Sequence, residues 1–132
     1  MHSTNYRATL ITVAPDTKAT TSIVPNKAGT IAALQYELVA NAPRKHTSDD
    51  VLFLVYSRRR GLRPTQKART DFFSKPQACL RSPLARSYGF GILHDDTGRI
   101  ELVPMDSQDY RELIGNPEIK KVPAMRKSRA GA

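Results

Sequence analysis

Apolar residues recur along the chain in short segments, some rich in β-branched residues as in strands and others at the spacing of a helix. The β-branched run Tyr6–Val13 predicts a strand with apolar side chains on both faces. Phe90–His94 and Arg99–Val103 flank the turn-forming sequence Asp-Asp-Thr-Gly at 95–98, which predicts a β-hairpin. We therefore expect a small antiparallel sheet that includes a C-terminal hairpin.

Helices are predicted where capping residues precede apolar residues at helical spacing. Thr47 and Asp50 have the spacing of a capping box ahead of the apolar run Val51–Tyr56. That run alone suits a strand as well as a helix, but acids before it and Arg58–Gly61 after it favour a helix. Further helices are expected from Thr30 to Asn41, from Thr65 to about Lys75, from Ser82 to Gly89 and from Ser107 to Gly115.

These elements predict an α+β fold in which several short helices pack on one face of the sheet. With 132 residues, 39% of them hydrophobic and 25% charged, the chain has the size and composition of one globular domain. We place this domain at residues 1–119. Residues 120–132 are basic and lack a core-forming period, so they are expected to be a mobile tail.

Cysteine content and hydropathy predict a cytoplasmic protein. Cys79 is the single cysteine, which excludes an intrachain disulfide. The N-terminus lacks the apolar region of a signal peptide, and the longest apolar run, Val51–Tyr56, is too short to cross a membrane. We expect no membrane partner.

The net charge of +9 is unevenly distributed. Residues 57–86 hold nine basic residues and one acid, a net +8, whereas residues 87–119 hold two basic residues and seven acids, a net −5. Residues 1–56 are close to neutral, with five basic residues and four acids, and residues 120–132 carry five basic residues and no acid. The basic character therefore belongs to a central stretch and to the C-terminal segment.

Four segments together resemble a family of small bacterial proteins that is catalogued as a domain of unknown function. They are His-Thr-Ser-Asp-Asp-Val-Leu-Phe at 46–53, Phe-Phe-Ser-Lys at 72–75, Cys-Leu-Arg-Ser at 79–82 and Tyr-Gly-Phe-Gly-Ile at 88–92. The resemblance spans nearly the whole chain. The resemblance implies a bacterial, cytoplasmic protein, and it implies no activity, cofactor or catalytic residue.

Cys79 is the candidate catalytic residue. Nearby cations and a helix N-terminus beyond Ser82 would lower the pKa of its thiol, which predicts a small enzyme or a redox-responsive protein as one alternative. Tyr88 and His94 are candidates for the same pocket, with Arg81 or Arg86 binding an anion. Against this, the spacing matches no phosphatase or thioredoxin signature, and a lone cysteine is typically a small buried side chain.

His94 and the following acids could form a metal or general-base site, since carboxylates and imidazole are metal ligands. The spacing matches no ligand signature, and Asp95–Gly98 is already accounted for as a turn. No phosphate-binding glycine loop or dinucleotide fingerprint is present. We expect no metal and no cofactor.

A run of arginines is the main candidate for binding. The predicted anion-binding residues are Arg58, Arg59, Arg60, Arg63, Arg81 and Arg86. Such a cluster favours a non-enzymatic module for an anionic partner, either a nucleic acid or an acidic protein surface. No helix-turn-helix, zinc-finger or aromatic RNA-binding motif indicates sequence-specific reading.

Two other interpretations of the arginines remain. They can stabilise a helix C-terminus and offset the acids of residues 87–119 within the same fold. Alternatively, the basic stretch of one copy can meet the acidic stretch of another, which predicts a homo-oligomer. These interpretations differ in where they place the two stretches relative to one another.

Overall fold

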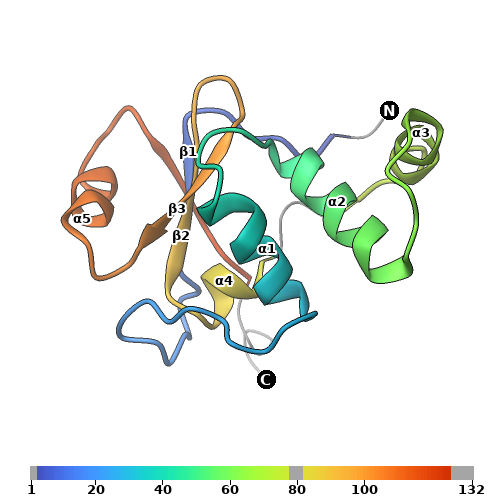
Figure 1. The fold of residues 1–132 in the computed structure, drawn as a ribbon. Helices are drawn as coiled ribbons and strands as arrows, with labels where there is room; N and C mark the ends of the chain where they lie inside the picture. The colour runs from blue at the N-terminus through green and yellow to red at the C-terminus, as the bar shows by residue number, and fades with distance from the viewer. Residues whose placement is uncertain (1–2, 78–81, 126–132) are drawn as a thin grey trace.

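The computed structural model describes residues 3–77 and 82–125, and within them four helices follow the first strand before the chain returns to the sheet (Figure 1). The strands are β1 Thr9–Thr12, β2 Phe90–His94, β3 Ile100–Pro104 and β4 Lys120–Pro123. The helices are α1 Ile31–Ala40, α2 Ser48–Arg60, α3 Gln66–Phe73, α4 Pro83–Arg86 and α5 Gln108–Ile114. The α+β class is confirmed.

The sheet has the order β3-β2-β1-β4 and is mixed. β2 and β3 form the predicted hairpin, and Asp95 shapes its turn because its Oδ1 accepts hydrogen bonds from the N–H groups of Thr97 and Arg99, both at 2.9 Å. β1 pairs with β2 in antiparallel orientation. The antiparallel prediction does not extend to β4, which is parallel to β1.

Strand β4 also shifts the predicted boundary between domain and tail. Its backbone continues the pairing at both ends, with Lys120 N–H donating to Ala8 C=O at 3.0 Å and Ala124 N–H donating to Thr12 C=O at 2.9 Å. Residues 120–123 therefore belong to the sheet and not to a tail. Residues 126–132 lie outside the described part of the chain.

Most helices cover one face of the sheet. Ile11, Ile92 and Ile100 point to this face and pack with side chains of α1, α2 and α4, among them Val39, Val51 and Ala85. The predicted ends of α2 are confirmed: Thr47 and Asp50 form the capping box, and Gly61 ends the helix in the left-handed conformation, with φ at 65°. The ambiguous apolar run before it is therefore helical.

Helix α5 covers the opposite face, which differs from the predicted packing of helices on one face. Leu10, Leu93 and Val103 are buried there against Tyr110 and Leu113. The physical reason is the alternation of side chains along a strand: these strands are apolar at successive positions, so both faces must be shielded from water. Figure 1 shows α5 on one side of the sheet and α1, α2 and α4 on the other.

Candidate anion-binding surface

The C-terminal end of α2 presents arginines whose side chains are not needed to complete the helix. The N–H of Gly61 donates to the C=O of Arg58 at 3.2 Å, and the N–H of Leu62 donates to the C=O of Ser57 at 2.9 Å. This pair of bonds is a Schellman motif, which satisfies the carbonyl groups of Ser57 and Arg58 with backbone alone. The side chains of Arg59 and Arg60 are exposed to solvent.

The turn after α2 continues the exposed basic segment into α3. Arg63 and Lys67 are exposed, and Leu62 between the two helices is 47% exposed. Thr65 begins α3 by accepting a hydrogen bond from the N–H of Ala68 at 3.1 Å, as its sequence predicts. We call Arg59, Arg60, Arg63 and Lys67 the basic arm.

Arg69 belongs to the same stretch of sequence but holds the fold together. Its Nη2 lies 2.9 Å from Asp50 Oδ1, and its guanidinium lies 5.8 Å and 5.4 Å from the ring centres of Phe53 and Phe73. The side chain is only 26% exposed. Arg69 therefore ties α3 to the start of α2 and is not counted among the free cations.

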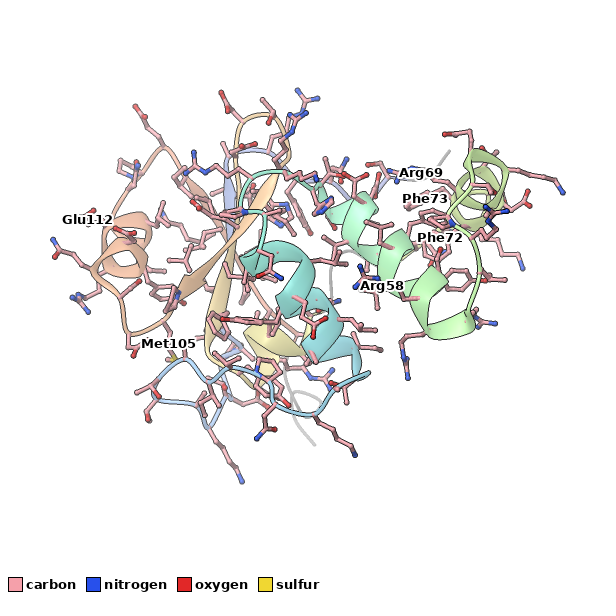
Figure 2. All side chains as sticks on the ribbon, in the orientation of Figure 1. Arg58, Arg69, Phe72, Phe73, Met105 and Glu112 are labelled. Atoms are coloured by element: carbon pink, nitrogen blue, oxygen red, sulfur yellow. The ribbon has the colours of Figure 1, made fainter. Side chains whose placement is uncertain are left out.

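Aromatic rings form the rest of the contact between α3 and α2. Phe72 lies 4.6 Å from Tyr56 and 5.8 Å from Phe53 between ring centres. Figure 2 shows Phe72 and Phe73 pointing from α3 toward α2. The guanidinium of Arg60 lies 4.7 Å from the centre of the Tyr56 ring, so this arginine borders the aromatic contact while remaining exposed.

Arg58 and Arg86 lie apart from the basic arm. Arg58 lines a hollow of about 320 Å³ with Glu37, Asn41 and His46, so it faces α1. Arg86 is exposed on α4, and α1 contacts both α4 and α2. Of the six predicted arginines, Arg59, Arg60 and Arg63 are exposed at the end of α2 and in the turn after it, whereas Arg81 lies outside the described residues.

The acids of α5, Asp109 and Glu112, lie across the sheet from α2. Figure 2 shows Glu112 on α5, across the sheet from Arg58 and Arg69. In the described ranges the salt bridges are Arg44–Glu101 and Arg69–Asp50, and neither joins the basic stretch to the acidic one. Ion pairing between these two stretches within one chain is therefore absent from the described residues.

The candidate pocket residues are not brought together. Tyr88 precedes β2 and packs with the cluster of Ala32, Leu84 and Phe90, whereas His94 ends β2. The length of the strand thus separates them. Cys79 lies outside the described residues, so its predicted role stays a prediction.

His94 is fully buried between β1 and β3. Its ring meets that of Tyr6 edge to face at 5.3 Å, and neither ring nitrogen has a hydrogen-bond partner among the described residues. Burial lowers the pKa of His94 to about 4, against a smaller opposing effect of Asp95. The imidazole is therefore neutral at pH 7 and belongs to the core.

A hollow that the sequence did not predict lies between β3 and α5. It measures about 400 Å³ and is lined by three acids, Glu101, Asp109 and Glu112. The only sequence signal for it is the net −5 of residues 87–119, and that signal does not show which acids meet. In the part of the chain that the structure describes, no group of three His, Cys, Asp or Glu side chains is arranged to hold a metal ion.

The fold and this surface define an α+β protein with a mixed four-stranded sheet and a basic helical arm. The chain belongs to the family of unknown function DUF6157, whose model matches residues 1–130. This confirms the resemblance to an uncharacterised family. Searches of curated proteins and of solved structures find no significant match. None of the helices described is both long and apolar enough to span a bilayer.

Proposed function

We propose that the protein is a non-enzymatic module that binds the phosphate backbone of a nucleic acid through its basic arm. The observation that carries the proposal is the separation of charge: Arg59, Arg60, Arg63 and Lys67 are exposed and form no salt bridge with a described residue. Cations that are not neutralised within the chain are available to a polyanion.

The chemistry of the arm favours phosphate. Three of its four cations are arginines, whose planar guanidinium groups bind phosphate oxygens in pairs. A helix C-terminus needs no more than the cations of its last turn for macrodipole stabilisation, about 0.3–1 kcal/mol each, so that effect does not account for Arg63 and Lys67. They lie beyond α2, in the turn and in α3.

The proposed binding is independent of base sequence. The arm consists of a helix end, a turn and the start of a short helix, and it does not have the docking geometry of a recognition helix. Contacts to phosphate fix position and carry no sequence information. We therefore expect similar affinity for unrelated sequences of equal length.

Fluorescence anisotropy with a labelled 20-base-pair DNA duplex and a labelled RNA of equal charge tests the proposal. Binding is expected at about 50 mM salt and should weaken at least tenfold at about 200 mM. Polyglutamate serves as the competitor. The absence of binding at low salt contradicts the proposal, and displacement by polyglutamate at equal charge concentration favours an acidic protein surface as the partner.

A further inference from the structure

Strand β3 forms one edge of the sheet, and on this edge the backbone groups of Leu102 are open to a further strand. Ile100 turns both its backbone groups away from β2: its N–H donates to His46 C=O at 2.8 Å and its C=O accepts from Arg44 N–H at 2.9 Å. Backbone groups of alternate residues in an antiparallel strand point to the same side, so those of Leu102 also point outward. None of the described residues hydrogen-bonds to them.

The neighbouring positions of this edge are closed. The segment that carries Arg44 and His46 covers Ile100, as described above. Pro104 has no N–H, and its C=O accepts from Ser107 N–H at 3.0 Å. The edge of β3 is thus protected at both ends and open in the middle, where an extended peptide has room for a short pairing.

Two hollows border the open position, one on each face of β3. The acidic hollow, already described, lies on the α5 side and includes Glu101, Asp109 and Glu112. The apolar hollow, of about 260 Å³, lies on the α1 side; it is lined mainly by apolar residues, Tyr36, Val39, Ala40, Pro43 and Phe90, and also by Glu101, which borders both hollows. Leu102 lines both. A strand laid along this edge would therefore send alternate side chains into unlike surroundings.

The charge of the acidic hollow selects cations. Asp109 and Glu112 form no salt bridge with a described residue, and Arg44 offsets one of the three acids. Arg44 also shows that a guanidinium suits the rim, because its Nε and Nη2 donate to Glu101 Oε1 at 3.1 and 2.9 Å. This bond raises the pKa of Arg44. Arg44 reaches it from a left-handed backbone, with φ at 59°.

We infer that the edge of β3 binds an extended peptide of the pattern basic–apolar–basic from a partner protein. The apolar residue opposite Leu102 enters the apolar hollow, and its two basic neighbours point to the acidic hollow. Main-chain bonds to Leu102 supply pairing, and the side chains supply selectivity. This site is independent of the basic arm: the arm binds an anionic ligand, whereas the edge of β3 binds a cationic peptide.

Nuclear magnetic resonance titration with the peptide acetyl-Gly-Arg-Val-Arg-Gly-amide tests the inference. The Leu102 amide should shift on binding and exchange more slowly with solvent, and the analogue with both arginines replaced by glutamate should not bind. The double variant D109N/E112Q should bind the peptide roughly two- to fivefold more weakly.

The matched control is D96N/E118Q, which removes one aspartate and one glutamate from exposed positions outside the hollow and should retain the native affinity. Binding that leaves the Leu102 amide unchanged contradicts strand addition, and so does equal weakening in both double variants. If the Leu102 amide is already protected in the protein alone, and this protection grows with concentration, then a second copy occupies the edge and the inference of a separate partner is wrong.

Discussion

The buried side chain of His94 makes the stability of the protein depend on pH. Its pKa in the folded protein is about 4, below the 6.5 of an exposed imidazole, because burial disfavours the charged ring. Between pH 4 and pH 6.5, His94 therefore binds a proton more readily in the unfolded chain than in the folded protein. The stabilising effect of the neutral ring is complete above pH 6.5 and is lost as the pH falls toward 4.

We predict that stability falls by roughly 2 kcal/mol between pH 7 and pH 4.5 through His94. The variant His94→Phe should lose this part of the dependence, since phenylalanine can keep the ring contact with Tyr6 and has no proton to gain. Urea denaturation at both pH values measures the difference. The control His46→Phe, at a partly exposed position, should retain the native dependence. An unchanged pH dependence in His94→Phe would contradict the account.

Gly91 is required by close packing. A Cβ at this position would lie 2.8 Å from Cε2 of Tyr110 and 3.2 Å from Cδ1 of Leu10. The Tyr110 ring is fixed in place because its hydroxyl accepts a hydrogen bond from the N–H of Val13 at 3.2 Å. The contact with the ring thus joins α5 to β2.

We expect Gly91→Ala to reduce the free energy of unfolding by about 1–3 kcal/mol, because the added methyl group displaces the Tyr110 ring. Gly115→Ala is the matched control, since a Cβ there has no neighbour closer than 3.7 Å. Chemical denaturation of the two variants checks the prediction. Equal stability of both variants would mean that α5 moves freely enough to accept the methyl group.

At the scale of elements, α3 depends on few contacts. It is held to α2 by aromatic rings and by Arg69, which bonds to Asp50 at 2.9 Å. Figure 1 shows α3 at the outer end of α2, away from the sheet. Elements with few tertiary contacts open locally before the whole protein unfolds.

Arg69→Gln is therefore predicted to increase amide hydrogen exchange across Gln66–Phe73 severalfold while leaving exchange in β2 unchanged. The change removes both the ion pair with Asp50 and the stacking on Phe53 and Phe73. Lys67→Gln, an exposed cation of the same helix, is the control and should exchange as the native protein does. Uniformly faster exchange in both variants would contradict a specific tether.

Local sequence signals predicted the elements better than their arrangement. The capping box at Thr47, the glycine after α2 and the 95–98 turn act within a few residues, and all three are confirmed. Strand β4 escaped prediction because Lys120 and Lys121 conceal it in a basic segment, and its pairing with β1 joins residues more than a hundred positions apart. The acidic hollow, by contrast, joins nearby segments, and it escaped prediction because net charge does not show how α5 packs against β3.

At the scale of the whole molecule, its two ends carry opposite charge. The basic arm lies at the end of α2 and the start of α3, and the acidic hollow lies between β3 and α5. Figure 1 shows α2 and α5 on opposite sides of the sheet. The sequence predicted both stretches but left open whether they neutralise one another. Chain folding decides this point, because α2 and α5 pack on opposite faces.

The salt dependence of DNA binding tests the role of the basic arm most directly. The variant R59Q/R60Q/R63Q removes three cations from the arm, and K18Q/K27Q/K45Q removes three exposed cations elsewhere, so the two variants have equal net charge. We predict that the slope of log K against log salt becomes less negative by about 2.7 in the first variant, or 0.9 per lost phosphate contact, and is unchanged in the second. Equal slopes in both variants would show that binding follows net charge alone and would contradict a localised phosphate-binding arm.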